Sequence, residues 1–214
     1  KAPLGTFAIY GNHDYNEYIS LGSDGRFRKV ESQLPAIMRG FARLFSVNDK
    51  NQEGAIVRAP VEEFADLKEL LTESGIHLLH NETIQIGKKN GCINLTGLGD
   101  YMTGHCQPAV AFRSYDARIP GIVLSHNPDS YDMLAHYPGD LLLFGHTHGG
   151  QVNLPFIWKK VTPLKNKMLK SGLFHLDLRH LYVNRGLGAT FPFRWFAPPE
   201  ISLLELTKQG PIKT

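Results

Sequence analysis

The sequence predicts a layered α/β domain, because short apolar runs of strand length alternate with segments in which apolar residues recur at helical spacing. Three of the strand-like runs end in polar loops, after Tyr10, Leu124 and Phe144. Ligands of such folds collect at the carboxyl ends of strands, so we expect a site where these loops meet. The 214 residues are enough for one sizeable core, and we expect a single domain over 1–214.

The apolar patterns also locate the individual elements. They predict strands at 6–10, 76–79, 83–86, 92–98, 121–126, 140–144, 172–178, 180–184 and 201–206. Helical spacing predicts helices at 61–75, 109–118 and 130–136. The strands at 76–79 and 83–86 are close enough to form a hairpin across 80–82. Together these elements predict two sheets with flanking helices.

Composition narrows the class of protein. With 42% hydrophobic and 20% charged residues, the chain has the composition of a soluble globular protein. No run reaches the roughly 18 apolar residues that span a bilayer. The net charge of +3 suits an acidic substrate such as a phosphate ester, and many other enzymes share it. A nuclease would carry a broader Lys/Arg face with stacking aromatic residues, so we expect no nucleic-acid partner.

The loop after Phe144 contains two histidines, His146 and His148, between glycines. In a regular strand these side chains would point to opposite faces, but in a glycine-flanked loop they can turn toward one ion or two adjacent ions. Imidazole binds Zn, Fe, Mn and Ni. The alternative is a pair of surface histidines.

The loop after Tyr10 contains Asn12, His13 and Asp14. An Asn oxygen is a neutral metal ligand, His13 is a proton donor, and Asp14 can fix the tautomer of that histidine and raise its pKa. Considered alone, this loop is equally well explained as a turn. His126 follows a buried strand, where a capping or packing role is the alternative.

Together, G-N-H-D at 11–14, S-H at 125–126 and G-H-T-H-G-G-Q at 145–151 resemble, in this order, the motifs of the calcineurin-like metallophosphoesterase family. The segments 184–188 and 197–201 look like the bacterial branch of small, membrane-associated phosphodiesterases. The resemblance covers nearly the whole chain. It implies a two-sheet layered sandwich flanked by helices.

The resemblance also implies a two-metal site and the role of each motif residue. Asn12, His126 and His146 would bind one divalent ion and His148 the other. Mn²⁺ is favoured, and Fe or Zn also suits oxygen and nitrogen ligands. His13 would stabilise charge on the phosphate or protonate the leaving oxygen, and Asp14 would orient His13. Ions in such sites activate a water for in-line attack on phosphorus.

One departure from the family pattern concerns the first motifs, D-x-H and G-D-x-x-D, which this chain lacks. We expect them, with the first strands of the domain, before Lys1, so that the chain is truncated at its N-terminus. It then keeps three ligands for one metal ion and one for the other. We expect these 214 residues alone to bind metal weakly and to turn over little substrate.

An inserted segment at 18–58 distinguishes this chain from a minimal domain. Apolar residues recur there at helical spacing, and Arg39 and Arg43 fall on the other side. Such a basic amphipathic helix suits a membrane surface or an acyl chain, and Arg39, Arg43 and Phe41 are candidate substrate contacts. The alternative is a helix packed on the core. The aromatic segment 191–196 is either a second interfacial edge or core.

The whole pattern resembles the UDP-diacylglucosamine pyrophosphatases of lipid A synthesis, particularly the chlamydial type. That resemblance implies a UDP-linked lipid substrate, cleaved to UMP and an acylated glucosamine phosphate (lipid X). It also implies peripheral attachment to the cytoplasmic face of the bacterial inner membrane, with no protein partner. The alternatives are a general phosphodiesterase or nuclease of the same family, and a non-catalytic scaffold of the same fold.

Several polar residues outside the three motifs are weaker candidates. Asp100, Asn127 and Arg185 lie near the motif loops, where they would contact substrate or simply build turns. We expect the remaining histidines to be structural: His77, His80, His105, His136, His175 and His180.

Overall fold

The computed structural model describes residues 2–16, 19–21, 26–29, 61–88, 91–153, 164–176, 178–189 and 193–207. Most of the expected insertion at 18–58 lies outside these residues, as do Arg39, Phe41 and Arg43. The insertion and the single-domain boundary therefore stay predictions.

The main element is a six-stranded mixed sheet with strand order β5-β6-β7-β8-β10-β9. Its strands are β5 (Glu82–Lys88), β6 (Gly91–Gly97), β7 (Gly121–Leu124), β8 (Leu141–Phe144), β9 (Gly172–Leu176) and β10 (Arg179–Val183). The inner strands β6, β7, β8 and β10 run parallel, and β5 and β9 pair antiparallel at the two edges. The expected α/β class is confirmed.

Parallel inner strands are covered on both faces, which explains why β7 and β8 are continuous apolar runs. In β6 the buried Asn94 and Thr96 are hydrogen-bonded through their side chains instead. Val123, Leu142, Leu181 and Val183 are almost completely buried in one hydrophobic cluster around these strands. The strands are fixed in register by this burial, so their carboxyl ends meet at a common edge of the sheet.

Two further pairs of strands lie outside the main sheet. The strand β1 (Phe7–Ala8) runs parallel to β4 (His77–Leu78), and β2 (Ile19–Leu21) pairs antiparallel with β3 (Phe27–Lys29). The predicted hairpin between 76–79 and 83–86 is wrong, because β4 pairs with β1 and β5 pairs with β6. Asn81 explains the separation: its backbone is left-handed (φ 55°) and turns the chain between the two strands.

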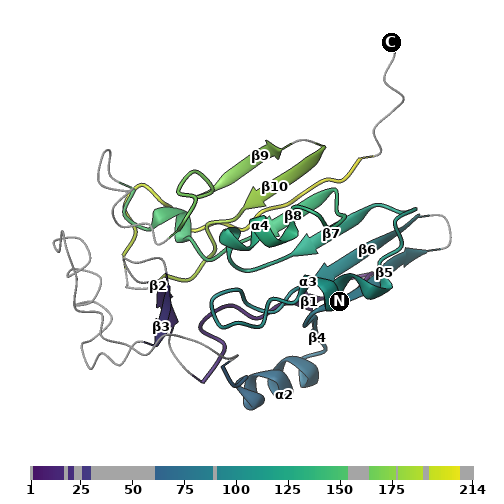
Figure 1. The fold of residues 1–214 in the computed structure, drawn as a ribbon, viewed down its shortest axis with the longest axis horizontal. Helices are drawn as coiled ribbons and strands as arrows, with labels where there is room; N and C mark the ends of the chain where they lie inside the picture. Colours follow the sequence, from purple (N-terminus) through teal and green to yellow (C-terminus); the bar gives the residue numbers. More distant parts are fainter. Residues whose placement is uncertain are drawn as a thin grey trace, which may run out of the picture.

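The helices are shorter than the sequence patterns predicted. They are α2 (Ala65–Glu73), α3 (Pro108–Ala111), the 3₁₀ turn η1 (Phe112–Ser114), η2 (Pro128–Ser130), α4 (Tyr131–Leu134) and η3 (His148–Gly150). The helix expected over 109–118 ends early: Tyr115 is extended (φ −74°, ψ 126°), and Asp116, whose carbonyl accepts from Asn94 Nδ2 (2.9 Å), begins a turn. Figure 1 shows α2 and β9 at opposite edges of the molecule.

The strand predicted at 201–206 is also wrong: this segment follows β10 without a strand ladder in the described residues (Figure 1). Side chains anchor its start instead, since Ser202 Oγ lies 2.6 Å from Tyr182 Oη and 2.8 Å from Asn184 Nδ2. No helix in the described part of the chain is both long and apolar enough to span a membrane.

Candidate metal centre

Three loops at strand ends converge on Asn12. Its Oδ1 lies 3.1 Å from His126 Nε2, after β7, and 3.0 Å from His146 Nδ1, after β8. The rings of His126 and His146 meet edge to face, with centroids 5.1 Å apart. The three residues expected to share one metal ion are thus brought together although more than 100 positions separate Asn12 from either histidine.

The close approach of His126 depends on Gly11. A Cβ atom added at Gly11 would lie 2.8 Å from Cε1 and 2.9 Å from Nε2 of the His126 ring, closer than side chains pack. Only glycine therefore leaves His126 its position beside Asn12.

The loop after β8 has an unusual backbone. His146 (φ 64°), His148 (φ 50°) and Gln151 (φ 49°) are all left-handed, a conformation that residues with a Cβ adopt at an energetic cost. Thr147 holds the loop in this form: its hydroxyl donates to the carbonyl of Lys170 (2.6 Å) and accepts from Gly149 N–H (3.1 Å). Such clusters of strained backbone are typical of functional sites.

Burial favours the neutral form of two histidines of the site, His126 and His148. It lowers the pKa of His126 to about 3, and the nearby His13 and His148 add to this shift. Burial also lowers the pKa of His148 to about 4, with further contributions from the Arg194 guanidinium and His13. A neutral imidazole offers a lone pair, so amide oxygen and imidazole nitrogen here form a donor set that suits a divalent transition-metal ion.

Arg194 is a residue of the site that the sequence did not single out. Its guanidinium donates to the carbonyls of Arg185 (2.9 Å) and Gly186 (3.0 Å) and lies 3.5 Å from His148 Nδ1. It therefore fixes the loop 185–188 beside His148. The only signal in the sequence was an arginine within the apolar, aromatic run 191–196.

His13 is exposed at the edge of this cluster, with Nε2 3.4 Å from Asn12 Nδ2. Asp14 Oδ2 accepts a hydrogen bond from Gly11 N–H (2.7 Å), so this carboxylate closes the turn that carries Asn12 and His13. A role for Asp14 in orienting the His13 ring stays a prediction.

The weaker candidates differ in accessibility. Asp100 is fully buried, with Oδ1 accepting from the N–H groups of Met102 and Thr103, and burial raises its pKa to about 6. Asn127 is also buried, and its side chain caps η2 by accepting from Asp129 N–H. Neither presents surface to a substrate, so both build turns beneath the site.

Arg185, the third of these candidates, lies next to the loop after β8. Its Nε donates to Glu200 Oε2, and its aliphatic carbons pack where a Cβ at Gly149 would lie. Glu200 therefore holds Arg185 against Gly149 in the loop after β8. A contact of Arg185 with substrate stays a prediction.

A surface hollow of about 290 Å³ lies elsewhere, at the amino ends of β7 and β8. It is lined by Tyr115, Ala117, Arg118, Ile119, Pro120, Pro138, Gly139 and Asp140. Because the histidines gather at the carboxyl ends of the same strands, this hollow is not part of the candidate metal centre.

The strand-end site and sequence comparison agree on the class of protein. The chain is 30% identical over 208 residues to the uncharacterized metallophosphoesterase YkuE of Bacillus subtilis (strain 168), covering 96% of this chain and 57% of the relative. The chain is thus similar to metallophosphoesterases, which confirms the expected resemblance to the calcineurin-like metallophosphoesterase family. No family model and no solved structure matches the chain.

Among individual proteins, the chain is similar to the UDP-2,3-diacylglucosamine pyrophosphatase LpxG of Chlamydia muridarum (strain MoPn / Nigg). The two are 36% identical over 215 residues, which cover 95% of this chain and 64% of the relative. The chain is also 38% identical over 138 residues to the phosphodiesterase YaeI of Escherichia coli (strain K12), covering 64% of this chain and 50% of the relative. It thus spans less than two thirds of the length of these relatives.

Proposed function

We propose that the protein is a metal-dependent phosphoester and pyrophosphate hydrolase that cleaves UDP-diacylglucosamine to UMP and an acylated glucosamine phosphate. The observation that carries the hydrolase proposal is the convergence of His126 and His146 on Asn12 Oδ1. The substrate is proposed from the similarity to the chlamydial pyrophosphatase.

In this proposal Asn12 Oδ1, His126 Nε2 and His146 Nδ1 hold one divalent ion and His148 contributes to a second, with Mn²⁺ favoured. The ions would supply activation of the attacking water and neutralise the phosphate oxygens. The protein's own contribution is to hold these side chains in place and to favour the neutral form of His126 and His148. Burial lowers the pKa of His126 and His148, and the left-handed backbone turns His146 and His148 into the site.

His13 is the proposed proton donor. Attack of water forms a new P–O bond, and the P–O bond to the leaving phosphate breaks at the same phosphorus. The leaving oxygen then gains negative charge, which the exposed His13 ring beside Asn12 would stabilise, or neutralise by donating a proton.

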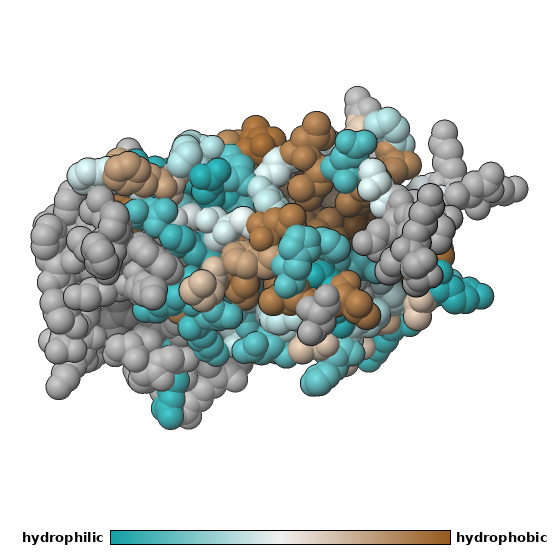
Figure 2. Space-filling view, turned by 90° about the horizontal axis from the view of Figure 1, so that it is seen from above, coloured by the Kyte–Doolittle hydropathy of each residue, from teal (hydrophilic) through white to brown (hydrophobic). Residues whose placement is uncertain are grey.

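Exposed aromatic residues support an encounter with lipid. Phe193, Trp195 and Phe196 are 40%, 49% and 66% exposed, which favours the interfacial interpretation of segment 191–196 over a core position. Figure 2 shows hydrophobic surface gathered on the face viewed from above Figure 1, where β9 and β10 lie. This arrangement supports peripheral association with a membrane. The cytoplasmic face of the inner membrane is proposed from the similarity to the chlamydial pyrophosphatase.

A general phosphodiesterase activity is the second candidate, and the similarity to YaeI of Escherichia coli favours it. Both candidates use the same metal centre and differ in what the rest of the surface recognises. A simple phosphodiester substrate therefore distinguishes them.

The test is hydrolysis by the full-length protein of UDP-diacylglucosamine in mixed micelles with Mn²⁺, with products identified by mass spectrometry. We expect UMP and the acylated sugar phosphate from the wild type, and loss of both products in His148→Ala. His136→Ala, which removes an exposed histidine away from the metal centre, is the matched control and should retain activity.

Cleavage of bis-p-nitrophenyl phosphate with the lipid left intact would reject the substrate proposal and retain the hydrolase. If the wild type cleaves neither compound, the hydrolase proposal fails and a non-catalytic role takes its place.

A further inference from the structure

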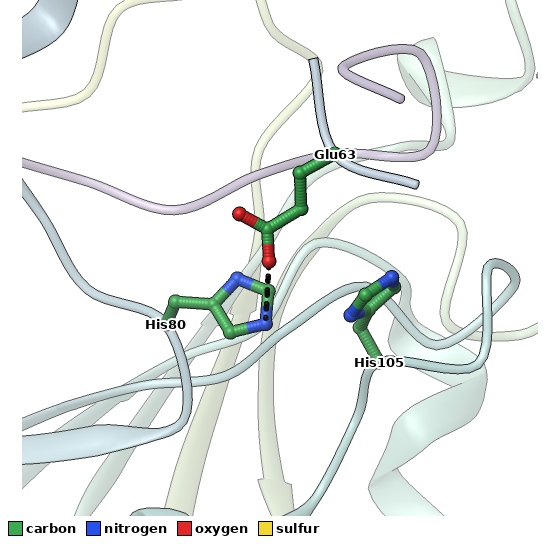
Figure 3. Close-up of side chains that lie close together, drawn as sticks. All are labelled: Glu63, His80 and His105. Carbon is green, nitrogen blue, oxygen red and sulfur yellow. Dashed lines mark ion pairs between the residues drawn. The ribbon is translucent and has the colours of Figure 1, made fainter. Parts of the chain in front are cut away.

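A second group of potential metal ligands lies apart from the strand-end histidines. Glu63 precedes α2, His80 lies between β4 and β5, and His105 lies in the loop after β6. Figure 3 shows the three side chains converging from these separate segments. One ligand atom of each lies within 4.8 Å of those of the other two, and His80 Nε2 is 3.5 Å from Glu63 Oε1.

We propose that Glu63, His80 and His105 bind a zinc ion. This site is distinct from the candidate metal centre at Asn12, His126, His146 and His148, which is called the phosphoester centre below. Ligand atoms about 2.1 Å from a tetrahedral zinc ion lie roughly 3.4 Å from one another. The His80–Glu63 separation of 3.5 Å already matches that spacing, and small side-chain rotations would close the remaining distances. Two imidazoles and a carboxylate form a recurrent zinc ligand set that leaves a fourth position for water.

The hydrogen bonding of His105 prepares it to be a ligand. Its Nε2 lies 2.5 Å from the carbonyl oxygen of Val61, which can only accept, so Nε2 carries the proton. Nδ1 of the same ring therefore keeps its lone pair. Metal-binding histidines commonly donate their other N–H to a backbone carbonyl in this way, because it fixes the tautomer and the ring orientation. Stacking on Tyr15, with centroids 4.8 Å apart, holds the same ring in place.

His80 lacks a complete set of protein partners. Its Nδ1 is buried and makes no hydrogen bond among the described residues, while Nε2 faces Glu63. Buried polar atoms without a partner are uncommon in folded proteins. Nε2, which has only Glu63 beside it among the described residues, is therefore the atom of this ring that is placed to bind an ion.

The three segments are held in place without the ion. Asn81 Nδ2, next to His80, donates to the carbonyl of His105 (2.8 Å). Val61 N–H donates to the carbonyl of Thr103 (3.1 Å), and Glu63 forms an antiparallel bridge with Tyr15. A site built on an existing scaffold loses little conformational entropy on binding. All three ligand residues are partly accessible, so an ion and a water can reach them.

This position relates the zinc site to the phosphoester centre. Tyr10 and Tyr15 flank the loop that carries Asn12 to Asp14, and their rings contact His80 and His105 respectively. An ion bound by His80 and His105 would therefore stabilise the position of this loop through the two tyrosine rings.

The test is the number of zinc ions bound by the full-length protein after chelator treatment, reloading with Zn²⁺ and desalting, measured by inductively coupled plasma mass spectrometry. We expect the double variant Glu63→Gln/His80→Gln to bind one equivalent fewer than the wild type and to show a smaller zinc-dependent rise in Tm. His136→Gln is the matched control and should bind the wild-type number.

A wild-type zinc count in the folded double variant would overturn the proposal. If circular dichroism shows that the double variant is unfolded, Glu63→Gln alone is measured, because it keeps the side-chain shape and removes only the charge. His148→Ala separates the two sites: it should lose zinc from the phosphoester centre while the Glu63-dependent equivalent remains.

Discussion

At the scale of single residues, the candidate metal centre depends on closely packed atoms around Asn12. The Asn12 amide oxygen lies within hydrogen-bond distance of both His126 and His146. Gly11, which lacks a Cβ atom, allows the His126 ring to approach. The sequence motifs identified Asn12, His126 and His146, because each follows a strand end. They could not reveal Arg194, whose role depends on carbonyl groups of a loop that packs beside it only in the fold.

Gly11→Ala tests the close approach to His126. The added methyl group would lie 2.8 Å from the ring, so the ring must move away from Asn12. We expect Mn²⁺ affinity and kcat/KM to fall at least about tenfold, equivalent to roughly 1.4 kcal/mol. Gly91→Ala is the control, because nothing lies within 4 Å of a Cβ there. Equal affinities of the two variants would show that His126 need not stay where it is.

The lowered pKa values of His126 and His148 predict how the metal-free protein responds to acid. The unfolded chain takes up protons on these histidines near pH 6.5, whereas the folded chain resists until about pH 3 to 4. Their contribution to the free energy of unfolding is therefore greatest above pH 6.5 and decreases as the pH falls. In NMR titrations we expect neither ring to change between pH 8 and pH 5. A titration of His126 near pH 6.5 would contradict this.

At the scale of elements, local pattern predicted the strands better than their partners. The segments that became β6, β7, β8 and β10 were predicted because each is rich in apolar residues over the length of a strand. The predicted hairpin was wrong because the partner of a strand is decided by residues far away in the sequence. The left-handed Asn81 sends β5 toward β6, and no local pattern announces that turn.

Asn81→Ala tests how strongly this turn joins the elements. Asn81 Oδ1 accepts from Gly99 N–H and Gln107 N–H (both 3.0 Å), and Nδ2 donates to the carbonyl of His105. Loss of three hydrogen bonds, at about 1 kcal/mol each, should lower the free energy of unfolding by roughly 3 kcal/mol in urea denaturation. Gln85→Ala, at an exposed position of β5, should change it by less than about 0.5 kcal/mol. A similar small loss in both would mean that the turn does not depend on this side chain.

At the scale of the whole molecule, the sequence predicted the α/β class and the candidate metal centre because three motifs lie in a fixed order along the chain. The Glu63–His80–His105 group had no such signal. Its members are 17 and 25 positions apart, on segments that contacts such as the bridge between Glu63 and Tyr15 and the hydrogen bond from Asn81 to His105 bring together in the fold. The histidines expected to be structural, His80 and His105, therefore became ligand candidates only in three dimensions.

Trp195→Ser/Phe196→Ser tests the proposed membrane-facing surface. These rings are exposed and stack on each other, with centroids 6.2 Å apart, so their apolar area is available to a bilayer. We expect binding to anionic phospholipid vesicles to weaken about tenfold or more, measured by co-sedimentation. Leu70→Ser, which removes an exposed apolar side chain from α2, should leave vesicle binding unchanged. Equal losses in both proteins would indicate nonspecific adsorption.

The most direct measurement is anomalous X-ray diffraction at the manganese edge from crystals of the full-length protein soaked in Mn²⁺. The account predicts a peak about 2–2.5 Å from Asn12 Oδ1, His126 Nε2 and His146 Nδ1, with a second ion bound by His148. An active enzyme whose manganese lies elsewhere, with Asn12 still hydrogen-bonded to the two histidines, would contradict it.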